Sequence, residues 1–199
     1  MFKIIISTVL LFVLVAFMPC VSTFAQETKT DQQKAMDAYM KAMAPNENHA
    51  FLKSFAGQWD VTSTAWMQPG APPSMSTSTG TAEVILGGRY LMMKYQGVMF
   101  GQPFEGIQIM GYDNTQKKYN TFWIDNTSTS FYLTTGTRDA AGNTFNDTGL
   151  WPDPMTGGTS KVRAVTKIIS PDEFTYELFM VGSDGKEFKS LENRAVRKK

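Results

Sequence analysis

Cysteine and histidine are almost absent from this chain of 199 residues, which contains one of each. A single cysteine forms no internal disulfide, and a single histidine excludes every metal motif that needs two imidazoles. An excess of charge of either sign is missing too, because the chain has 19 basic and 18 acidic residues. A net charge near zero offers no basic surface to a phosphate backbone, so we expect no nucleic-acid partner.

Signature motifs of enzymes are also missing. The sequence contains no G-x-S-x-G elbow, no P-loop and no G-x-G-x-x-G that opens a helix. Proton transfer would therefore fall to Asp, Glu, Tyr, Lys and Arg side chains. We expect no cofactor and no bound metal, and the composition gives no positive sign of catalysis.

The first 25 residues have the three parts of a secretory signal peptide. Lys3 precedes an apolar run over residues 4–17, and Thr23 and Ala25 supply small side chains before the cut. The run is shorter than the roughly 20 residues that a membrane span needs. We expect cleavage after Ala25 and export to the periplasm or the medium, with no membrane span in the mature protein. The alternatives are a retained anchor and a lipoprotein acylated at Cys20, which the bulky residues before that cysteine disfavour.

Residues 26–46 are expected to form a helix and a linker. Helix-forming residues fill positions 31–44, Thr30 or Asp31 would cap the helix, and Pro45 would end it. The methionines of this helix repeat at helical spacing and form one apolar face: Met36, Met40 and Met43. That face would either pack on the main body or act as a mobile lid over a ligand.

From Gly57 onward the chain is rich in β-branched and aromatic residues, with turn-forming residues at near-even intervals. The turns lie at residues 68–74, 87–88, 101–103, 113–117, 126–128, 139–143, 152–158, 170–172 and 183–185. Long strands joined by short turns predict an antiparallel up-and-down meander, and closure would remove its costly open edges. Residues 47–199 are therefore expected to form an all-β, about ten-stranded antiparallel barrel, preceded by one N-terminal helix.

The predicted strands mix polar and apolar residues on each face. On one face of the fifth strand, Thr121 and Asp125 accompany Tyr119 and Trp123. Such a face makes a poor dry core, but it suits a barrel interior that holds a ligand or ordered water. The sequence does not fix which face points inward.

Gly57-Gln58-Trp59 resembles the G-x-W motif of the calycin barrels, a group that includes lipocalins, fatty-acid-binding proteins and nitrobindins. In that group the tryptophan packs beside an arginine of the last strand and closes one barrel end. The resemblance implies that Trp59 pairs with Arg194, with Arg197 as the second choice.

A longer set of motifs resembles the bacterial domain of unknown function 1579, and it covers nearly the whole mature chain. The motifs are His49-Ala50-Phe51-Leu52, Gly57-Gln58-Trp59, Gly87-Gly88-Arg89-Tyr90-Leu91, Pro103-Phe104-Glu105-Gly106, Gly111-Tyr112-Asp113 and Trp123-Ile124-Asp125. This family has no established activity, so the resemblance implies the lipocalin-like fold and no chemistry. The haem histidine of nitrobindins comes from late in the barrel, whereas His49 precedes the strands, so we expect His49 to cap or pack rather than to bind haem.

Candidate ligand contacts are Arg89, Glu105, Tyr112, Trp123 and Asp125. If Arg89 is buried after its glycine turn, it needs a partner, either Glu105 or the carboxylate of a ligand. Tyr112 would offer a phenol to the interior. Trp123 and Asp125 share a strand face and would form an aromatic wall with a carboxylate rim, or else ordinary packing with a turn cap.

Three functions remain open. The first is an exported barrel that binds a small, mainly apolar ligand, with a carboxylate held by Arg89. The second is an envelope structural or interaction protein whose barrel is filled. The third is an isomerase or decarboxylase that uses Glu105, Tyr112 and Asp125. The ligand and the oligomeric state do not follow from the sequence.

Overall fold

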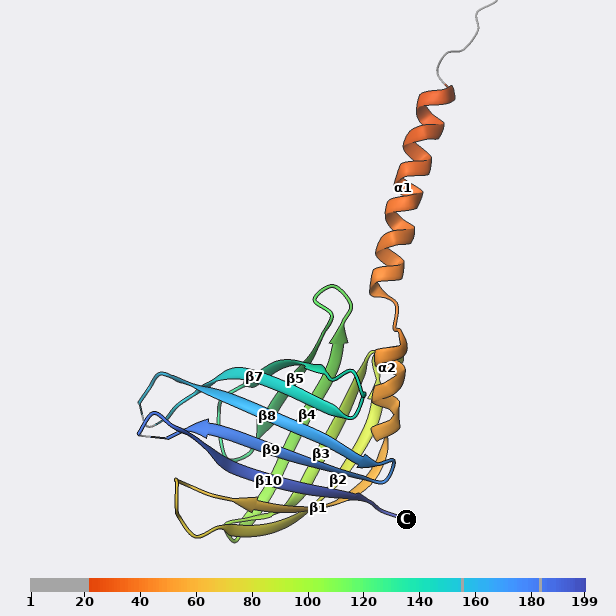
Figure 1. The fold of residues 1–199 in the computed structure, drawn as a ribbon. Helices are drawn as coiled ribbons and strands as arrows, with labels where there is room; N and C mark the ends of the chain where they lie inside the picture. Colours follow the sequence, from red (N-terminus) through yellow and green to blue (C-terminus); the bar gives the residue numbers. More distant parts are fainter. Residues whose placement is uncertain (1–21, 155, 183) are drawn as a thin grey trace, which may run out of the picture. The chain divides into compact units, whose positions relative to one another are not determined.

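The computed structural model describes residues 22–154, 156–182 and 184–199 (Figure 1). The apolar run of the predicted signal peptide and Cys20 lie outside the described residues, so export stays a prediction. The chain divides into two compact units, Met1–Ala42 and Met43–Lys199.

Helix α1, Ser22–Met43, begins earlier than the expected cap at Thr30. Residues 22–30 contain no proline or glycine, so nothing in the backbone stops the helix there. Its end at Met43, just before Pro45, agrees with the prediction. The side chains of Met36 and Met40 are exposed, and packing of this face on the main body stays a prediction. Among the described residues, no helix combines the length and the apolar character that crossing a membrane would require.

A short helix α2, Glu47–Leu52, and a 3-10 turn η1, Lys53–Phe55, lead into the barrel. Asn46 caps α2: its side chain accepts from the N–H of Asn48 at 2.9 Å, and its own N–H donates to Nδ1 of His49 at 3.1 Å. This reciprocal capping box confirms the capping role expected for His49. Burial lowers the pKa of His49, only partly opposed by a hydrogen bond to the backbone of Tyr112, and the Arg89 charge lowers it further.

Ten antiparallel strands form a closed barrel, as the turn spacing predicts. Each strand pairs with its neighbours in sequence, and β1 pairs with β10 to close the ring. The strands are β1 Gly57–Ala65, β2 Ser74–Ile85, β3 Tyr90–Met99, β4 Gln102–Asp113, β5 Lys118–Asp125, β6 Tyr132–Arg138, β7 Thr144–Pro152, β8 Thr159–Ser170, β9 Glu173–Val181 and β10 Glu187–Arg197. The turn η2, Leu86–Gly88, joins β2 to β3, and Gly87 adopts a φ of 68° that favours glycine there.

Helix α2 and η1 cover one end of the barrel and build a dry core with the strand ends beneath them (Figure 1). We call this cluster the helix-end core: Leu52, Phe55, Trp59, Phe145 and Phe174. The indole Nε1 of Trp59 donates to the backbone oxygen of Phe55 at 2.8 Å, so its only polar atom is satisfied. The Trp59 and Phe174 rings meet edge to face with centroids 4.9 Å apart.

The arginine beside Trp59 is Arg197, and the expectation for Arg194 is wrong. The guanidinium of Arg197 stands 4.2 Å from the Trp59 ring centroid, and the two residues are direct partners in the β1–β10 ladder. Arg194 is three positions away and therefore points to the other face of the strand. Its Nε donates to Glu173 at 2.8 Å on the outer surface.

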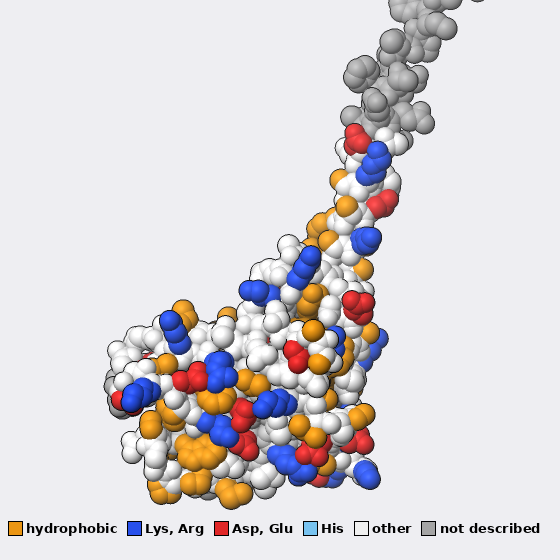
Figure 2. Space-filling view, in the orientation of Figure 1, with side chains coloured by type: hydrophobic (Ala, Val, Ile, Leu, Met, Phe, Trp, Pro, Cys, Tyr) orange, Lys and Arg blue, Asp and Glu red, His pale blue; other side chains and the backbone are white. Residues whose placement is uncertain are grey.

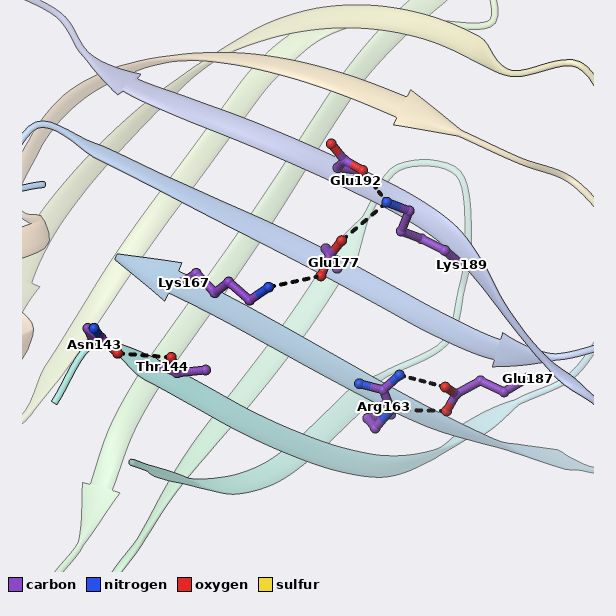
Figure 3. Close-up of polar contacts among 8 residues, drawn as sticks. All are labelled: Asn143, Thr144, Arg163, Lys167, Glu177, Glu187, Lys189 and Glu192. Carbon is purple, nitrogen blue, oxygen red and sulfur yellow. Dashed lines mark hydrogen bonds and ion pairs between the residues drawn. The ribbon is translucent and has the colours of Figure 1, made fainter. Parts of the chain in front are cut away.

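The outer surface of the barrel has two different faces. Over β8–β10, side chains of both charges intermingle (Figure 2). Lys189 of β10 contacts Glu177 of β9 and Glu192, while Arg163 of β8 makes a two-pronged contact with Glu187 (Figure 3).

Across β3–β6 the outer face carries a row of apolar side chains instead. The strand registers align four of them as an outer apolar row: Met92, Ile109, Phe122 and Leu133. Leu133 is 57% exposed, and the ring of Phe131 packs beside Phe122 with centroids 5.6 Å apart.

Candidate ligand-binding interior

The residues singled out from the sequence do not gather at one site. Arg89 is exposed and donates to the backbone oxygens of Leu86 at 3.4 Å and Met43 at 3.3 Å, outside the barrel. Glu105 is exposed on the outer face. The β3–β4 register pairs Glu105 with Gln96, far along the hairpin from Arg89. The expected pair of Arg89 with Glu105 is therefore wrong.

Tyr112 belongs to the packing at the helix end. Its ring lies edge-on to His49 at 5.9 Å and to Tyr119 at 4.9 Å between centroids. In the β4–β5 ladder, Tyr112 is opposite Tyr119, whereas Asp125 is opposite Gly106. Asp125 and Tyr112 thus lie at opposite ends of the hairpin, and the proposed acid–base trio with Glu105 does not form.

Trp123 and Asp125 share a face, as their spacing predicts. Nε1 of Trp123 donates to Oδ2 of Asp125 at 2.7 Å, and Oδ1 accepts from the N–H and the hydroxyl of Thr127 at 2.9 and 2.6 Å. Both carboxylate oxygens are thus occupied, which is the turn-cap interpretation. The Trp123 ring packs against Gly106, where an added Cβ would come within 2.4 Å of it. Trp123 forms an aromatic wall together with Tyr95 and Phe104.

Asp147 of β7 is the residue that the sequence did not single out. Only 4% of it is exposed, and burial raises its pKa to about 6. Its Oδ1 is buried and accepts no hydrogen bond from any described residue. Gly136 faces Asp147 across the β6–β7 ladder, and a Cβ there would lie 2.0 Å from Oδ1. The glycine therefore makes the space that the carboxylate occupies.

Other strands of the barrel contribute further inward polar side chains. Burial raises the pKa of Tyr176 on β9, and the charges of Asp147 and Tyr95 raise it further. The hydroxyl of Tyr95 donates to Oε1 of Gln108 at 3.2 Å, and burial raises the pKa of Tyr95 as well. Asn193 of β10 is the ladder partner of Tyr176, and its Oδ1 is buried without a hydrogen bond from the described part of the chain. We call this set the central polar group: Tyr95, Gln108, Asp147, Tyr176 and Asn193.

Strand alternation was the one signal available for Asp147. Phe145, Asp147, Gly149 and Trp151 occupy one face of β7, and Phe145 is fully buried. If the inward face of β7 were known from the sequence, Asp147 would be recognised as an interior residue. The sequence lacked that information because both faces of this strand carry polar residues.

Two hollows lie away from the central polar group. One of about 490 Å³ is lined by outward side chains of β1, β2 and β3, including Thr62, Thr79 and Gln96. The other, of about 280 Å³, lies at the helix end between Phe51 and Pro171. Neither is lined by a member of the central polar group. In residues 22–154, 156–182 and 184–199, no three metal-ligating side chains cluster.

Comparison with known proteins supports the fold. None of the curated proteins matches the chain in sequence. The crystal structure of Rv2717c from M. tuberculosis is 15% identical, with a TM-score of 0.59, over 78% of this chain and 100% of that one. A redesigned beta barrel, mFAP1, bound to DFHBI, is 18% identical with a TM-score of 0.39, over 73% of this chain and 97% of that one. At such identities the likeness to Rv2717c extends to the fold alone.

The barrel, its tryptophan-arginine closure and the helix that covers one end all fall within a single matched region. Residues 44–197 match the family model described as protein of unknown function (DUF1579). The chain therefore belongs to the DUF1579 family.

Proposed function

We propose that the barrel binds a small, mainly apolar ligand in its interior. The observation that carries this proposal is unused hydrogen-bonding capacity on buried side chains, namely Oδ1 of Asp147 and Oδ1 of Asn193. A buried polar atom left without a partner costs about 1–3 kcal/mol. Native proteins retain such atoms where a ligand or an ordered water satisfies them.

Part of the wall around these polar atoms is apolar. On β8 and β9 the inward side chains Val162, Ala164 and Leu178 form a second hydrophobic cluster, against which Trp151 and Met180 pack. An apolar lining with a few convergent polar groups is the usual composition of a small-molecule site. Tyr95 and Tyr176 retain some accessible surface although burial raises the pKa of each, which supports free space beside them.

The polar anchor differs from the one expected at the sequence level. Arg89 lies outside the barrel and makes backbone contacts there. A ligand carboxylate held by Arg89 is therefore no part of the proposal.

Small-molecule extraction and native mass spectrometry of the gently purified protein test this function. We expect a co-purified molecule, or saturable binding of a fatty acid or a hydrophobic dye. Thr134 points inward and Thr137 outward on the same strand, so Thr134→Phe should abolish binding while Thr137→Phe leaves it unchanged. Protein that carries nothing and ignores the whole panel would contradict the proposal, as would equal binding by both variants.

An interaction protein is the second candidate function, and the outer apolar row supports it. An apolar row that spans four strands is unusual on the surface of a monomeric domain. Light scattering after size-exclusion chromatography tests it with wild type and Leu133→Glu. A mass above that of the monomer in wild type only would support this candidate, and a monomer in both would contradict it.

Export completes the proposed role. A cut after Ala25 would release a chain that begins at Gln26 and contains no cysteine, consistent with an oxidising compartment. Intact-mass measurement of the mature protein checks this site. An uncut N-terminus or an acylated Cys20 would contradict it.

A further inference from the structure

Asp147 places a carboxyl group inside the barrel with no partner on its Oδ1. The residue is 4% exposed, and no described residue donates a hydrogen bond to its Oδ1. Buried charged groups are normally paired, because an isolated charge is costly in a low-dielectric interior. The carboxylate of Asp147 therefore requires a partner inside the barrel.

The cations of the described chain that approach the interior are engaged elsewhere. The guanidinium of Arg138 stands 3.9 Å from the ring centroid of Phe51. Arg197 stands over Trp59 and donates to backbone oxygens around η1. Arg163, on the neighbouring strand β8, does not approach the interior, because it points outward and pairs with Glu187. The described residues thus supply no counter-charge to Asp147.

We infer, on the basis of the proposed interior site, that the ligand carries an ammonium group and that the carboxylate of Asp147 binds it. The site is built around that carboxylate, because Gly136 leaves the space in which Oδ1 lies. An ammonium supplies both the opposite charge and the hydrogen-bond donors that a carboxylate lacks here.

The surroundings of Asp147 suit an organic cation better than an acid. Two members of the central polar group, Tyr95 and Tyr176, are aromatic, and aromatic faces attract cations. Asn193 adds a second free acceptor one strand from Tyr176, and a primary ammonium has three donors to distribute. A ligand carboxylate would instead meet the like charge of Asp147.

Three probes of equal chain length separate this inference from the function on which it rests: octylamine, octanol and octanoate. Each is titrated by calorimetry into wild type, Asp147→Asn and Asp60→Asn. Asp60 is exposed on β1, so its variant repeats the chemical change outside the barrel. We expect octylamine to bind wild type about 10- to 100-fold more tightly than octanol, with octanoate weakest. The preference should vanish in Asp147→Asn and persist in Asp60→Asn.

Each other result has one meaning. Equal affinities for octylamine and octanol in wild type, or a preference that survives in Asp147→Asn, would overturn the inference and leave the proposed function standing. No binding of any probe would overturn the inference, whereas the proposed function would fall only if the extraction and the ligand panel were negative as well.

A second measurement needs no variant. Addition of octylamine to carbon-13-labelled wild type should shift the side-chain carboxyl resonance of Asp147, while octanol should leave it in place. A resonance that does not respond to bound octylamine would overturn the inference.

Discussion

The helix end and the middle of the barrel are built from the same strands but differ in whether their buried polar groups have hydrogen-bond partners. At the helix end, aromatic rings meet at close quarters and the one indole N–H of Trp59 is satisfied. In the middle, Asp147 and Asn193 keep buried oxygens without partners. The contrast indicates that the helix end holds the fold together, so that the middle can carry groups that lower the stability of the free protein.

Removal of Trp59 should produce the largest loss of stability. Trp59→Ala takes away a fully buried ring and the contact with Arg197, so the free energy of unfolding should fall by about 3–5 kcal/mol. Urea denaturation measures it. Trp66→Ala is the matched control, because Trp66 is only half-buried and follows β1, and its loss should be about 1 kcal/mol. Equal losses of stability in the two variants would contradict a special role of the helix end in holding the fold together.

Asp147→Asn should raise the free energy of unfolding, whereas Trp59→Ala lowers it. The pKa of Asp147 is raised from 3.8 to about 6 in the folded state. A raised pKa means that this residue favours folding below pH 4, and that the contribution is lost as the pH rises through 6. At pH 8 the substitution should therefore stabilise the ligand-free protein by up to about 3 kcal/mol, with no gain below pH 4.

Denaturation curves from acid to alkaline pH measure the effect of Asp147→Asn. Asp60→Asn, on the outer face, should change stability little at any pH. A destabilised Asp147→Asn protein at pH 8 would mean that Asp147 supports the fold, and the contrast between the two regions would fail.

A methyl group at Gly136 of β6 should disturb the barrel interior around Asp147, which lies opposite on β7. It would collide with Oδ1 of Asp147 at 2.0 Å and with the backbone oxygen of Asn146 at 2.1 Å. Gly136→Ala should therefore cost about 1–3 kcal/mol in thermal or urea unfolding and weaken ligand binding. Gly158→Ala serves as the control, because its nearest contact would be 3.6 Å away, and it should be neutral or slightly stabilising. A neutral Gly136→Ala would show that Asp147 has room to move.

The smallest effect should distinguish two arginines of the last strand. Arg197→Met removes the stacking on Trp59 and the hydrogen bonds to the backbone oxygens of Ala56 and Ser54, with an expected loss of about 1–2 kcal/mol. Arg194→Met removes one exposed ion pair with Glu173 and should cost about 0–1 kcal/mol. If Arg194→Met proves the more harmful in urea denaturation, the closure assigned to Arg197 is wrong.

The sequence predicted the strands well because turns depend on local chemistry. Glycine, proline, asparagine, aspartate and serine punctuate the chain where the backbone reverses, and the ten strands lie between those points. It predicted the side-chain partners poorly because those depend on which face of a strand turns inward. Arg194 and Arg197 differ by three positions, and only the ladder with β1 decides that Arg197 meets Trp59.

Asp147 illustrates the same limit at the candidate site. Its position becomes informative only when Phe145 is known to point inward and Gly136 is known to lie opposite. Neither fact is local to the strand. Arg89 and Glu105, by contrast, lie in recognisable motifs, yet their side chains remain outside the barrel.

The pairing of β1 with β10 also governs how the protein folds. That ladder joins Trp59 to Arg197, so the barrel cannot close until almost the whole chain has been synthesised. Until then β1 and β9 both present unpaired edges, which favour association with other chains. Contacts between such distant residues slow folding, so closure of the last seam is expected to be the late step in the assembly of this protein.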